Sequence, residues 1–304
     1  MSAPELRRTR PGCSIGGNLT VLHRLNGPGD DPVLLVWDHA GWCPVVCKMF
    51  RSKRRAHREA TALSSLEHPN IVRCFGVHEP VYVLMEYLQG PRLSEFIRSR
   101  PDGRLSVSDS IRVAIHLGAA LEHIHGKGFL HLDVKPDNVV IVHGRPVLFD
   151  FGSLRVRTAE RPQQVHGTDP YIAPEEWLLE HTDISADVFS LGVTLYEMLT
   201  GKLPFPETRK RGSNQVTRGP NPLKRHRPQI SRRLEDLVLQ CLARDPRARP
   251  ALGTLLPALH GEISSGPSMW PRTLQNSRVW GARAGLAIPG TSARAGLSEA
   301  VSPR

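Results

Sequence analysis

The 304-residue sequence has no apolar run close to the roughly 20 residues that a helix needs to cross a bilayer. Its first residues carry arginines but no apolar segment behind them, so a secretory signal is not expected. The five cysteines are odd in number and scattered, and Cys43 and Cys47 lack a second pair to complete a zinc site. These absences predict a soluble cytoplasmic protein with free thiols and no membrane span.

Acidic residues are fewer than basic ones, 29 against 40, which gives a formal net charge of +11. Such a charge is compatible with a nucleic-acid-binding protein. The two ends of the chain, residues 1–17 and 263–304, carry more than half of it, and no nucleic-acid-binding module is recognisable. We therefore expect no specific nucleic-acid partner.

The pattern of apolar residues predicts short strands first and helices later. Strands are expected at residues 19–22, 33–36, 45–48, 71–77 and 81–87. A helix with Glu59, Leu63 and Leu66 on one face should lie between the third and fourth strands. Helices dominate from Leu93, and they include a long amphipathic one ended by Gly126 and two more at residues 185–199 and 234–242. In the long helix Gly118 lies on the apolar face, where its size should let a neighbouring element approach closely.

Both ends of the chain are expected to be disordered. Residues 1–17 form a basic arm, and residues 263–304 are rich in Gly, Ser, Ala, Pro and Arg without periodicity. Trp270 and Trp280 are unusual in such a tail and are candidates for docking on the domain or on a partner.

The chemistry is concentrated at residues 131–138, His-Leu-Asp-Val-Lys-Pro-Asp-Asn, called here the catalytic loop. A carboxylate, a lysine and an amide at this spacing are typical of phosphoryl transfer, although this segment alone could be a solvated loop. Asp150-Phe151-Gly152 follows seventeen residues after Asp133, and Gly-Thr-Asp-Pro-Tyr-Ile-Ala-Pro-Glu follows at 167–175. In this order and at these separations the three motifs support one another.

Together these motifs resemble the eukaryotic-type protein kinases, most of all the compact bacterial Ser/Thr kinases, over residues 21–261. The resemblance implies an α+β bilobal protein kinase fold, with a small antiparallel β-rich N-lobe containing one key helix and a larger, mainly α-helical C-lobe. The catalytic domain would span 18–262, with the N-lobe at about 18–85 and the C-lobe at about 89–262. The implied activity is transfer of the γ-phosphate of Mg-ATP to serine and threonine hydroxyls of proteins, with autophosphorylation and with Mn²⁺ as an alternative metal. The oligomeric state stays open.

The resemblance also carries site residues over. Asp133 would accept the proton of the substrate hydroxyl, and Lys135 would approach the γ-phosphate. Asn138 and Asp150 would hold the metal ions. The nucleotide-binding residues would be Lys48 on the phosphates, its partner Glu59, the apolar Leu25, Val33, Val46 and Val140 around the base, and the backbone of Glu86 and Leu88, next to the gatekeeper Met85.

Other matches are structural. Glu175 and Arg249 would form an ion pair that closes residues 150–175, the activation segment, onto the large lobe, and Asp187 would brace the catalytic loop. An apolar column would consist of Leu63, Cys74, His131 and Phe151. Lys135-Pro136 and Thr168 favour Ser/Thr over Tyr substrates, and Arg92 argues against substrates with a basic residue upstream of the acceptor.

The sequence departs from the family in two places. Asn26, Pro28 and Asp31 stand where glycines of the phosphate-binding loop would be, while a register shifted by one residue recovers Gly27 and Gly29 but puts Pro32 in the third place. Either register predicts weaker ATP binding, because proline has no N–H to offer. Leu132 stands where most of the family has the arginine that pairs with a phosphorylated activation segment, so we expect activity independent of phosphorylation at Thr158. The alternatives are a pseudokinase-like ATP-binding or interaction scaffold and a small-molecule kinase. Residues 167–175, which in the family dock a peptide, argue against the small-molecule kinase.

Overall fold

The computed structural model describes residues 10–27, 31–78, 81–205 and 213–263. The predicted tail beyond residue 263, with Trp270 and Trp280, lies outside the described residues, as do residues 1–9 of the predicted arm. Among the helices of the described ranges, none combines the length and hydropathy that a membrane crossing requires.

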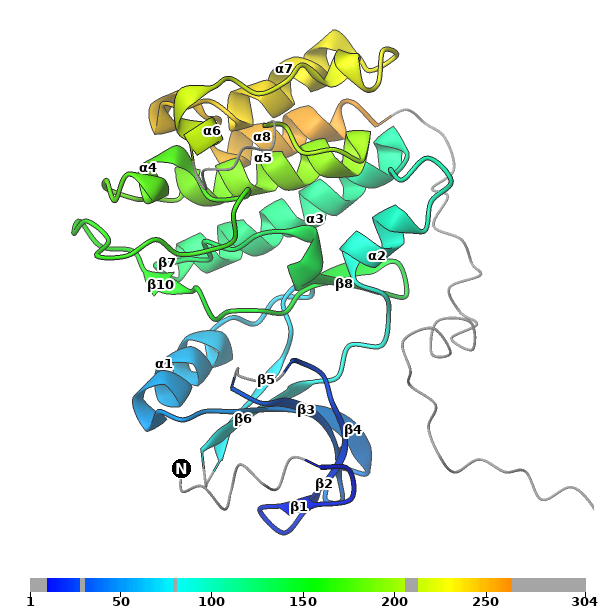
Figure 1. The fold of residues 1–304 in the computed structure, drawn as a ribbon, viewed down its shortest axis with the longest axis vertical. Helices are drawn as coiled ribbons and strands as arrows, with labels where there is room; N and C mark the ends of the chain where they lie inside the picture. Colours follow the sequence, from blue (N-terminus) through cyan, green and yellow to red (C-terminus); the bar gives the residue numbers. More distant parts are fainter. Residues whose placement is uncertain (1–9, 28–30, 79–80, 206–212, 264–304) are drawn as a thin grey trace, which may run out of the picture. The chain divides into compact units, whose positions relative to one another are not determined.

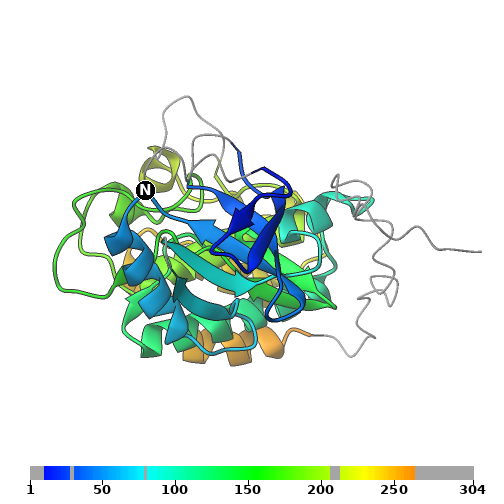
Figure 2. The ribbon, with the colours of Figure 1, turned by 90° about the horizontal axis from the view of Figure 1, so that it is seen from below.

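The small lobe is built on an antiparallel sheet of six strands in the order β1-β2-β3-β4-β6-β5 (Figure 1). The strands are β1 (Ser14–Ile15), β2 (Leu19–Arg24), β3 (Val33–Asp38), β4 (Cys43–Met49), β5 (Cys74–His78) and β6 (Tyr82–Glu86). Helix α1 (Lys53–Ser64) packs against β5 and β6, and Figure 2 shows it beside the curled sheet. The sheet therefore begins before residue 18, the expected start of the domain.

Alternation along β4 decides which of its side chains reach the site. Val45, Cys47 and Met49 point into the core cluster of the sheet and are at most 4% exposed. Because successive side chains of a strand point to opposite faces, Val46 and Lys48 share the other face, where both are only partly buried.

Two of the predicted boundaries are wrong. Residue 71 takes part only in an isolated parallel bridge with Leu148, so the strand expected at 71–77 is β5, which starts at Cys74. Leu66 lies beyond the end of α1, whose cap residue is Ser65. Leu66 is nevertheless buried, in a turn in which its amide donates to Leu63 O at 3.0 Å.

The large lobe is helical, as predicted. Its helices are α2 (Leu93–Arg98), α3 (Val107–Gly126), α4 (Pro174–Trp177), α5 (Ser185–Thr200), α6 (Ser213–Thr217), α7 (Arg232–Cys241) and α8 (Leu252–His260), with 3-10 turns at Pro136–Asn138, Leu223–Arg225 and Pro246–Ala248. Helix α3 ends at Gly126, as expected, and packs against α5 and α8. A Cβ on Gly118 would meet Leu256 Cδ2 at 2.4 Å, which confirms that this glycine allows a close approach.

Two small antiparallel sheets place the loops of the large lobe. Strands β8 (Val139–Val142) and β9 (Arg145–Leu148) pair directly after the catalytic loop and lead into Asp150. Strand β7 (Phe129–Leu130), directly before that loop, pairs with β10 (Arg155–Val156) of the activation segment. The α+β architecture with a strand-rich lobe and a helical lobe is therefore confirmed.

Candidate active site

Lys48 on β4 meets two carboxylates that come from other elements. Its Nζ lies 2.6 Å from Glu59 Oε1 on α1 and 3.9 Å from Asp150 Oδ1. The Lys48 and Glu59 side chains are only 14% and 9% exposed, so the pair is shielded from water. Partial burial raises the pKa of Asp150, but the Lys48 ammonium and the Gly152 N–H outweigh it and hold that pKa below its ordinary value. Asp150 is therefore an anion beside a cation.

The catalytic loop gathers two of the predicted side chains, Lys135 and Asn138, around Asp133. Asp133 Oδ2 accepts hydrogen bonds from Lys135 Nζ at 2.9 Å and from Asn138 Nδ2 at 2.8 Å. Lys135 also donates to Thr168 Oγ1 of the activation segment. The other oxygen, Asp133 Oδ1, is buried and has no partner in the described structure. A buried acceptor without a donor is costly unless a ligand group completes it, so Oδ1 is available to a hydroxyl.

The catalytic loop is held in place by Asp187 of α5 and by the close approach of Gly167. Asp187 accepts from the His131 amide at 2.9 Å and lies 2.8 Å from His125 Nε2. Burial raises the pKa of Asp187, but the hydrogen bonds and charge of the histidines outweigh it and lower that pKa. Gly167, at φ +97°, lets the activation segment pass so close to the loop that a Cβ there would lie 2.3 Å from Leu132 O.

The predicted base-binding residues come from the small-lobe sheet, from the connection after β6 and from β8. Leu25 donates its amide to Val33 O at 2.8 Å at the open end of β2 and β3. Val46 is opposite Met85 in the sheet, and Val140 on β8 forms an isolated bridge with Arg92. Glu86 and Leu88 are half-buried at and just after the end of β6. Their roles toward a nucleotide stay predictions.

The departures in the phosphate-binding loop have partners of their own. Residues 28–30, including Pro28, lie outside the described residues. Asn26 bridges the turn, since its side chain donates to Asp31 O at 2.8 Å and accepts from the Val33 amide at 3.0 Å. The Asp31 carboxylate lies 3.3 Å from Arg55 Nη1 and 4.0 Å from Arg51 Nε, so two cations offset its charge.

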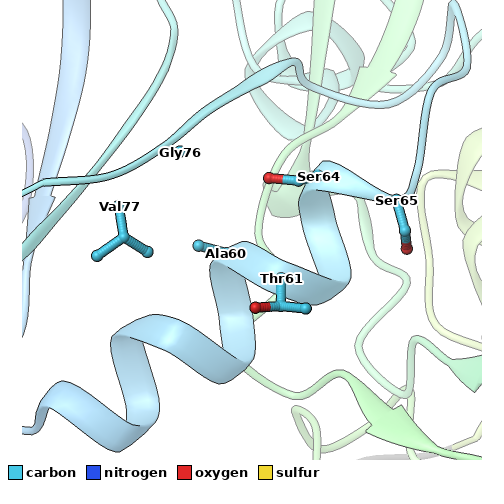
Figure 3. A pocket seen from close by; sticks show the side chains of 6 residues that line it. All are labelled: Ala60, Thr61, Ser64, Ser65, Gly76 and Val77. Atoms are coloured by element: carbon cyan, nitrogen blue, oxygen red, sulfur yellow. The ribbon is translucent and has the colours of Figure 1, made fainter.

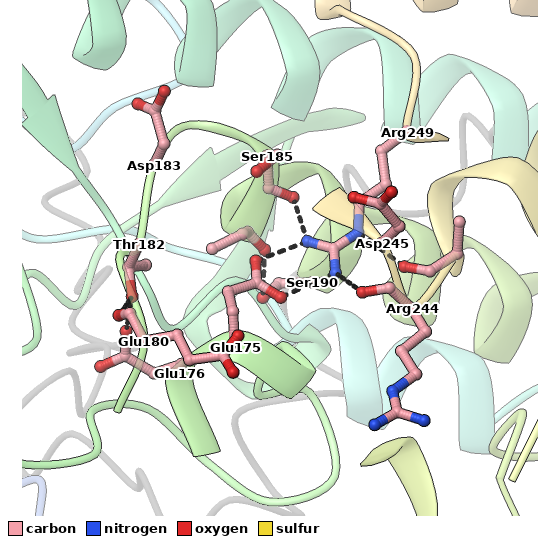
Figure 4. A network of polar contacts seen from close by, with 12 residues as sticks. Glu175, Glu176, Glu180, Thr182, Asp183, Ser185, Ser190, Arg244, Asp245 and Arg249 are labelled. Carbon is pink, nitrogen blue, oxygen red and sulfur yellow. Dashed lines mark hydrogen bonds and ion pairs between the residues drawn. The ribbon is translucent and has the colours of Figure 1, made fainter. Parts of the chain in front are cut away.

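The ion pair predicted between Glu175 and Arg249 is present and buried. Arg249 donates to both Glu175 oxygens, at 2.6 and 2.7 Å, and its side chain is 0% exposed. The same guanidinium donates to the carbonyls of Ser185 and Ala243, as part of the network in Figure 4. In the predicted apolar column, the His131 and Phe151 rings meet edge to face at 5.0 Å.

Sequence reasoning missed a second anchor of the activation segment at Glu176. This buried carboxylate contacts Arg155, His166 and Thr182, none of which belongs to a predicted motif. The available signal was the doubled glutamate after Ala173-Pro174, of which only Glu175 had been assigned.

A hollow of about 430 Å³ lies between α1 and β5, on a side of α1 where none of the predicted site residues lines it. Figure 3 shows its lining, which consists of Ala60, Thr61, Ser64, Ser65, Gly76 and Val77. These small side chains offer no ionisable group, so we place no chemistry there.

Asn138 and Asp150 fit the metal that the resemblance implies. The Asn138 nitrogen is committed to Asp133, which leaves the amide oxygen as its remaining acceptor. One amide oxygen and one carboxylate suit Mg²⁺, which prefers oxygen ligands and usually completes its shell with water and substrate phosphates.

Comparison with known proteins agrees with this geometry. The family described as "Protein kinase domain" matches residues 41–258, beginning after the irregular phosphate-binding loop. The serine/threonine-protein kinase PrkC of Bacillus subtilis is 31% identical over 77% of this chain and 39% of its own length. Serine/threonine-protein kinase A of Synechocystis is 35% identical over 71% of this chain and 47% of its own length.

The chain thus spans less than half of either curated relative. Among solved structures, the kinase domain of Mycobacterium tuberculosis PknI matches with a TM-score of 0.65 at 24% identity, over 83% of this chain and 99% of that one. That likeness shows the fold alone. The fold, the order of the motifs and the family match agree, and the chain belongs to the protein kinase family.

Proposed function

We propose that the chain is a serine/threonine protein kinase that transfers the γ-phosphate of Mg-ATP to protein hydroxyls. The observation that carries the proposal is the unpartnered Asp133 Oδ1, next to an Oδ2 that Lys135 and Asn138 hold in place. The names of the relatives, Ser/Thr protein kinases of two bacteria, support the substrate class.

In the proposed reaction the substrate hydroxyl donates to Asp133 Oδ1. Its oxygen forms a bond to the γ-phosphorus while the bond from that phosphorus to the leaving oxygen of ADP breaks, and the proton passes to Asp133. Lys135, already within reach of Asp133 and Thr168, would contact the transferring phosphate. Catalysis then depends on positioning and on charge neutralisation more than on covalent chemistry.

The nucleotide phosphates would lie against Lys48, which Glu59 holds through the 2.6 Å ion pair. Asn138 and Asp150 would hold Mg²⁺, which would neutralise part of the phosphate charge, and Mn²⁺ has similar ligand preferences. The irregular loop around Asn26 and Asp31 predicts weak ATP affinity, although the cationic partners of Asp31 remove part of the repulsion.

A pseudokinase-like scaffold is the alternative, and the same experiment separates the two. Labelled γ-phosphate transfer from Mg-ATP to the chain itself and to a generic Ser/Thr substrate is measured for the wild type, Asp133→Asn and Lys48→Met. Lys127→Met, on an exposed residue after α3, is the charge-matched control for Lys48. We expect transfer in the wild type and the control, and none in either site variant. No transfer by the wild type at millimolar ATP with either metal would refute the enzyme.

A further inference from the structure

Glu176 is the second of two adjacent glutamates in α4, and it is 1% exposed. Its neighbour Glu175 turns toward Arg249, whereas Glu176 lies on the side of Thr182 (Figure 4). An ionised carboxylate this deeply buried is costly unless several donors surround it. The donors around Glu176 therefore indicate which parts of the chain this carboxylate holds together.

Three residues supply these donors. Oε2 accepts from Thr182 Oγ1 at 2.7 Å and from Arg155 Nη2 at 3.4 Å. Oε1 accepts from the His166 amide at 3.2 Å, and His166 Nδ1 lies 3.1 Å from it. Burial raises the pKa of Glu176, but the hydrogen bonds from His166 and Thr182 and the charge of Arg155 outweigh it and lower that pKa. Glu176 is therefore held as an anion.

These contacts tie together two distant points of the activation segment. Arg155 lies in β10, which pairs with β7 directly before the catalytic loop. His166 precedes Gly167, which abuts Leu132, and Thr168, which contacts Lys135. One carboxylate thus fixes both ends of the stretch 155–166 and the approach of Thr168 to the catalytic loop.

Position 132 lacks the cation that would hold a phosphate group. Leu132 is 4% exposed and uncharged, so its side chain cannot bind a phosphorylated residue of the segment. Two cations of the segment are directed instead to carboxylates of the chain itself, Arg155 to Glu176 and Arg157 to Asp183. The anionic anchor is thus built into the sequence.

We propose that Glu176 is a positioning residue that acts as a permanent substitute for an activating phosphate, holding the activation segment ready for phosphoryl transfer. The inference rests on the proposed kinase function and deepens it. It assigns the regulation of that site to a fixed carboxylate, with Arg155 and His166 as its partners in the segment.

The test compares full-length Glu176→Gln, which keeps the side-chain volume and removes the charge, with Glu180→Gln on an exposed neighbour. We expect Glu176→Gln to lower kcat by roughly tenfold to a hundredfold with little change in the KM for ATP, because misplacement of reacting groups acts on the chemical step. Hydrogen exchange should speed up across residues 155–168 but not in α3 or α5. Glu180→Gln should match the wild type in both measurements.

A purely structural role is separated by two further variants. Glu176→Asp keeps the charge and should recover part of the kcat that Glu176→Gln loses, which a simple packing defect would not allow. Should Glu176→Gln fail to fold, Arg155→Gln removes the ion pair from the side of the segment and should speed exchange at 155–168.

The two proposals can fail separately. Wild-type kcat and unchanged exchange in Glu176→Gln, with Asp133→Asn inactive, would overturn the role of Glu176 and leave the kinase standing. An inactive wild type would overturn the kinase, while the exchange measurement would still test the anchor.

Discussion

Asp187 Oδ1 accepts a 2.7 Å hydrogen bond from the amide of Leu132, a residue 55 positions earlier in the chain. Leu132 has a φ of +63°, in the left-handed region that non-glycine residues rarely adopt. The same carboxylate accepts from the amide of His131. The conformation that directs Asp133 is therefore maintained from α5, by a buried charge whose donors are all in place.

Asp187→Asn should disrupt this arrangement, because an amide offers one acceptor oxygen where the carboxylate serves three donors. We expect a loss of about 2 kcal/mol in the free energy of unfolding and a large loss of phosphate transfer. Asp236→Asn, whose side chain is 59% exposed in an ion pair with Arg232, should change neither. Urea unfolding checks the prediction, and an Asp187→Asn protein as stable as the wild type would contradict it.

Arg249→Lys should destabilise the protein although it keeps the charge. A lysine ammonium cannot reproduce the two parallel hydrogen bonds to Glu175 or the bonds to backbone carbonyls. The substitution Glu175→Gln leaves the buried guanidinium of Arg249 without a counter-charge and should cost about 3–5 kcal/mol. Replacing both, as Glu175→Leu with Arg249→Met, should recover part of the loss in urea unfolding. Arg247→Lys, on a side chain 93% exposed, serves as the control.

Local sequence was sufficient for much of the fold. Periodicity placed α5 within one residue of its end, and Gly126 marked the end of α3. Gly118 was interpreted correctly because a glycine on the apolar face of a helix has few other uses. Motif spacing also brought together Lys48 and Glu59, which are in contact.

The contacts of single polar residues could not be predicted. The partners of Glu176 come from β10, from the segment after it and from the turn after α4, and no periodicity connects these positions. The pairing of Asp31 with Arg55 depends in the same way on the position of α1 relative to the loop before β3. Two-residue strands such as β1 are also too short to carry an alternation signal.

Two helix glycines should respond differently to alanine. A Cβ on Gly192 would lie 2.7 Å from Cys241 Cβ, an atom fixed to the backbone of α7, whereas the atom facing Gly118 is the end of the Leu256 side chain, which can rotate. Alanine gains about 1 kcal/mol of helix propensity at either site. We therefore expect Gly118→Ala to stay within about 1 kcal/mol of the wild type and Gly192→Ala to lose about 1–3 kcal/mol. The reverse order of their urea midpoints would contradict the packing described for α5 and α7.

Thr158→Ala should leave phosphate transfer unchanged, because Thr158 is exposed and Leu132 offers no charge to a phosphate there. Thr168→Ala is the matched substitution inside the site, since Thr168 contacts Lys135, and it should lower the rate. Steady-state transfer to a generic Ser/Thr substrate measures both. An inactive Thr158→Ala would show that phosphorylation of the segment is required after all.

The cysteines allow the core of the small lobe to be tested by chemistry. All five are free, as predicted, and burial raises the pKa of Cys47 and of Cys241 to about 12, whereas Cys43 is exposed. The thiolate is the reactive form, so at pH 8 only about one in ten thousand Cys47 thiols would be able to react even if the reagent reached them.

Iodoacetamide should therefore label Cys43 in the folded protein, and Cys47 and Cys241 only after unfolding, as mass spectrometry of the peptides would show. Raising the pH from 7 to 9 should leave Cys47 unlabelled, because both values lie well below its pKa. Cys43→Ser identifies the fast-reacting peptide. Rapid labelling of Cys47 in the native state would mean that β4 opens, and with it the strand that positions Lys48.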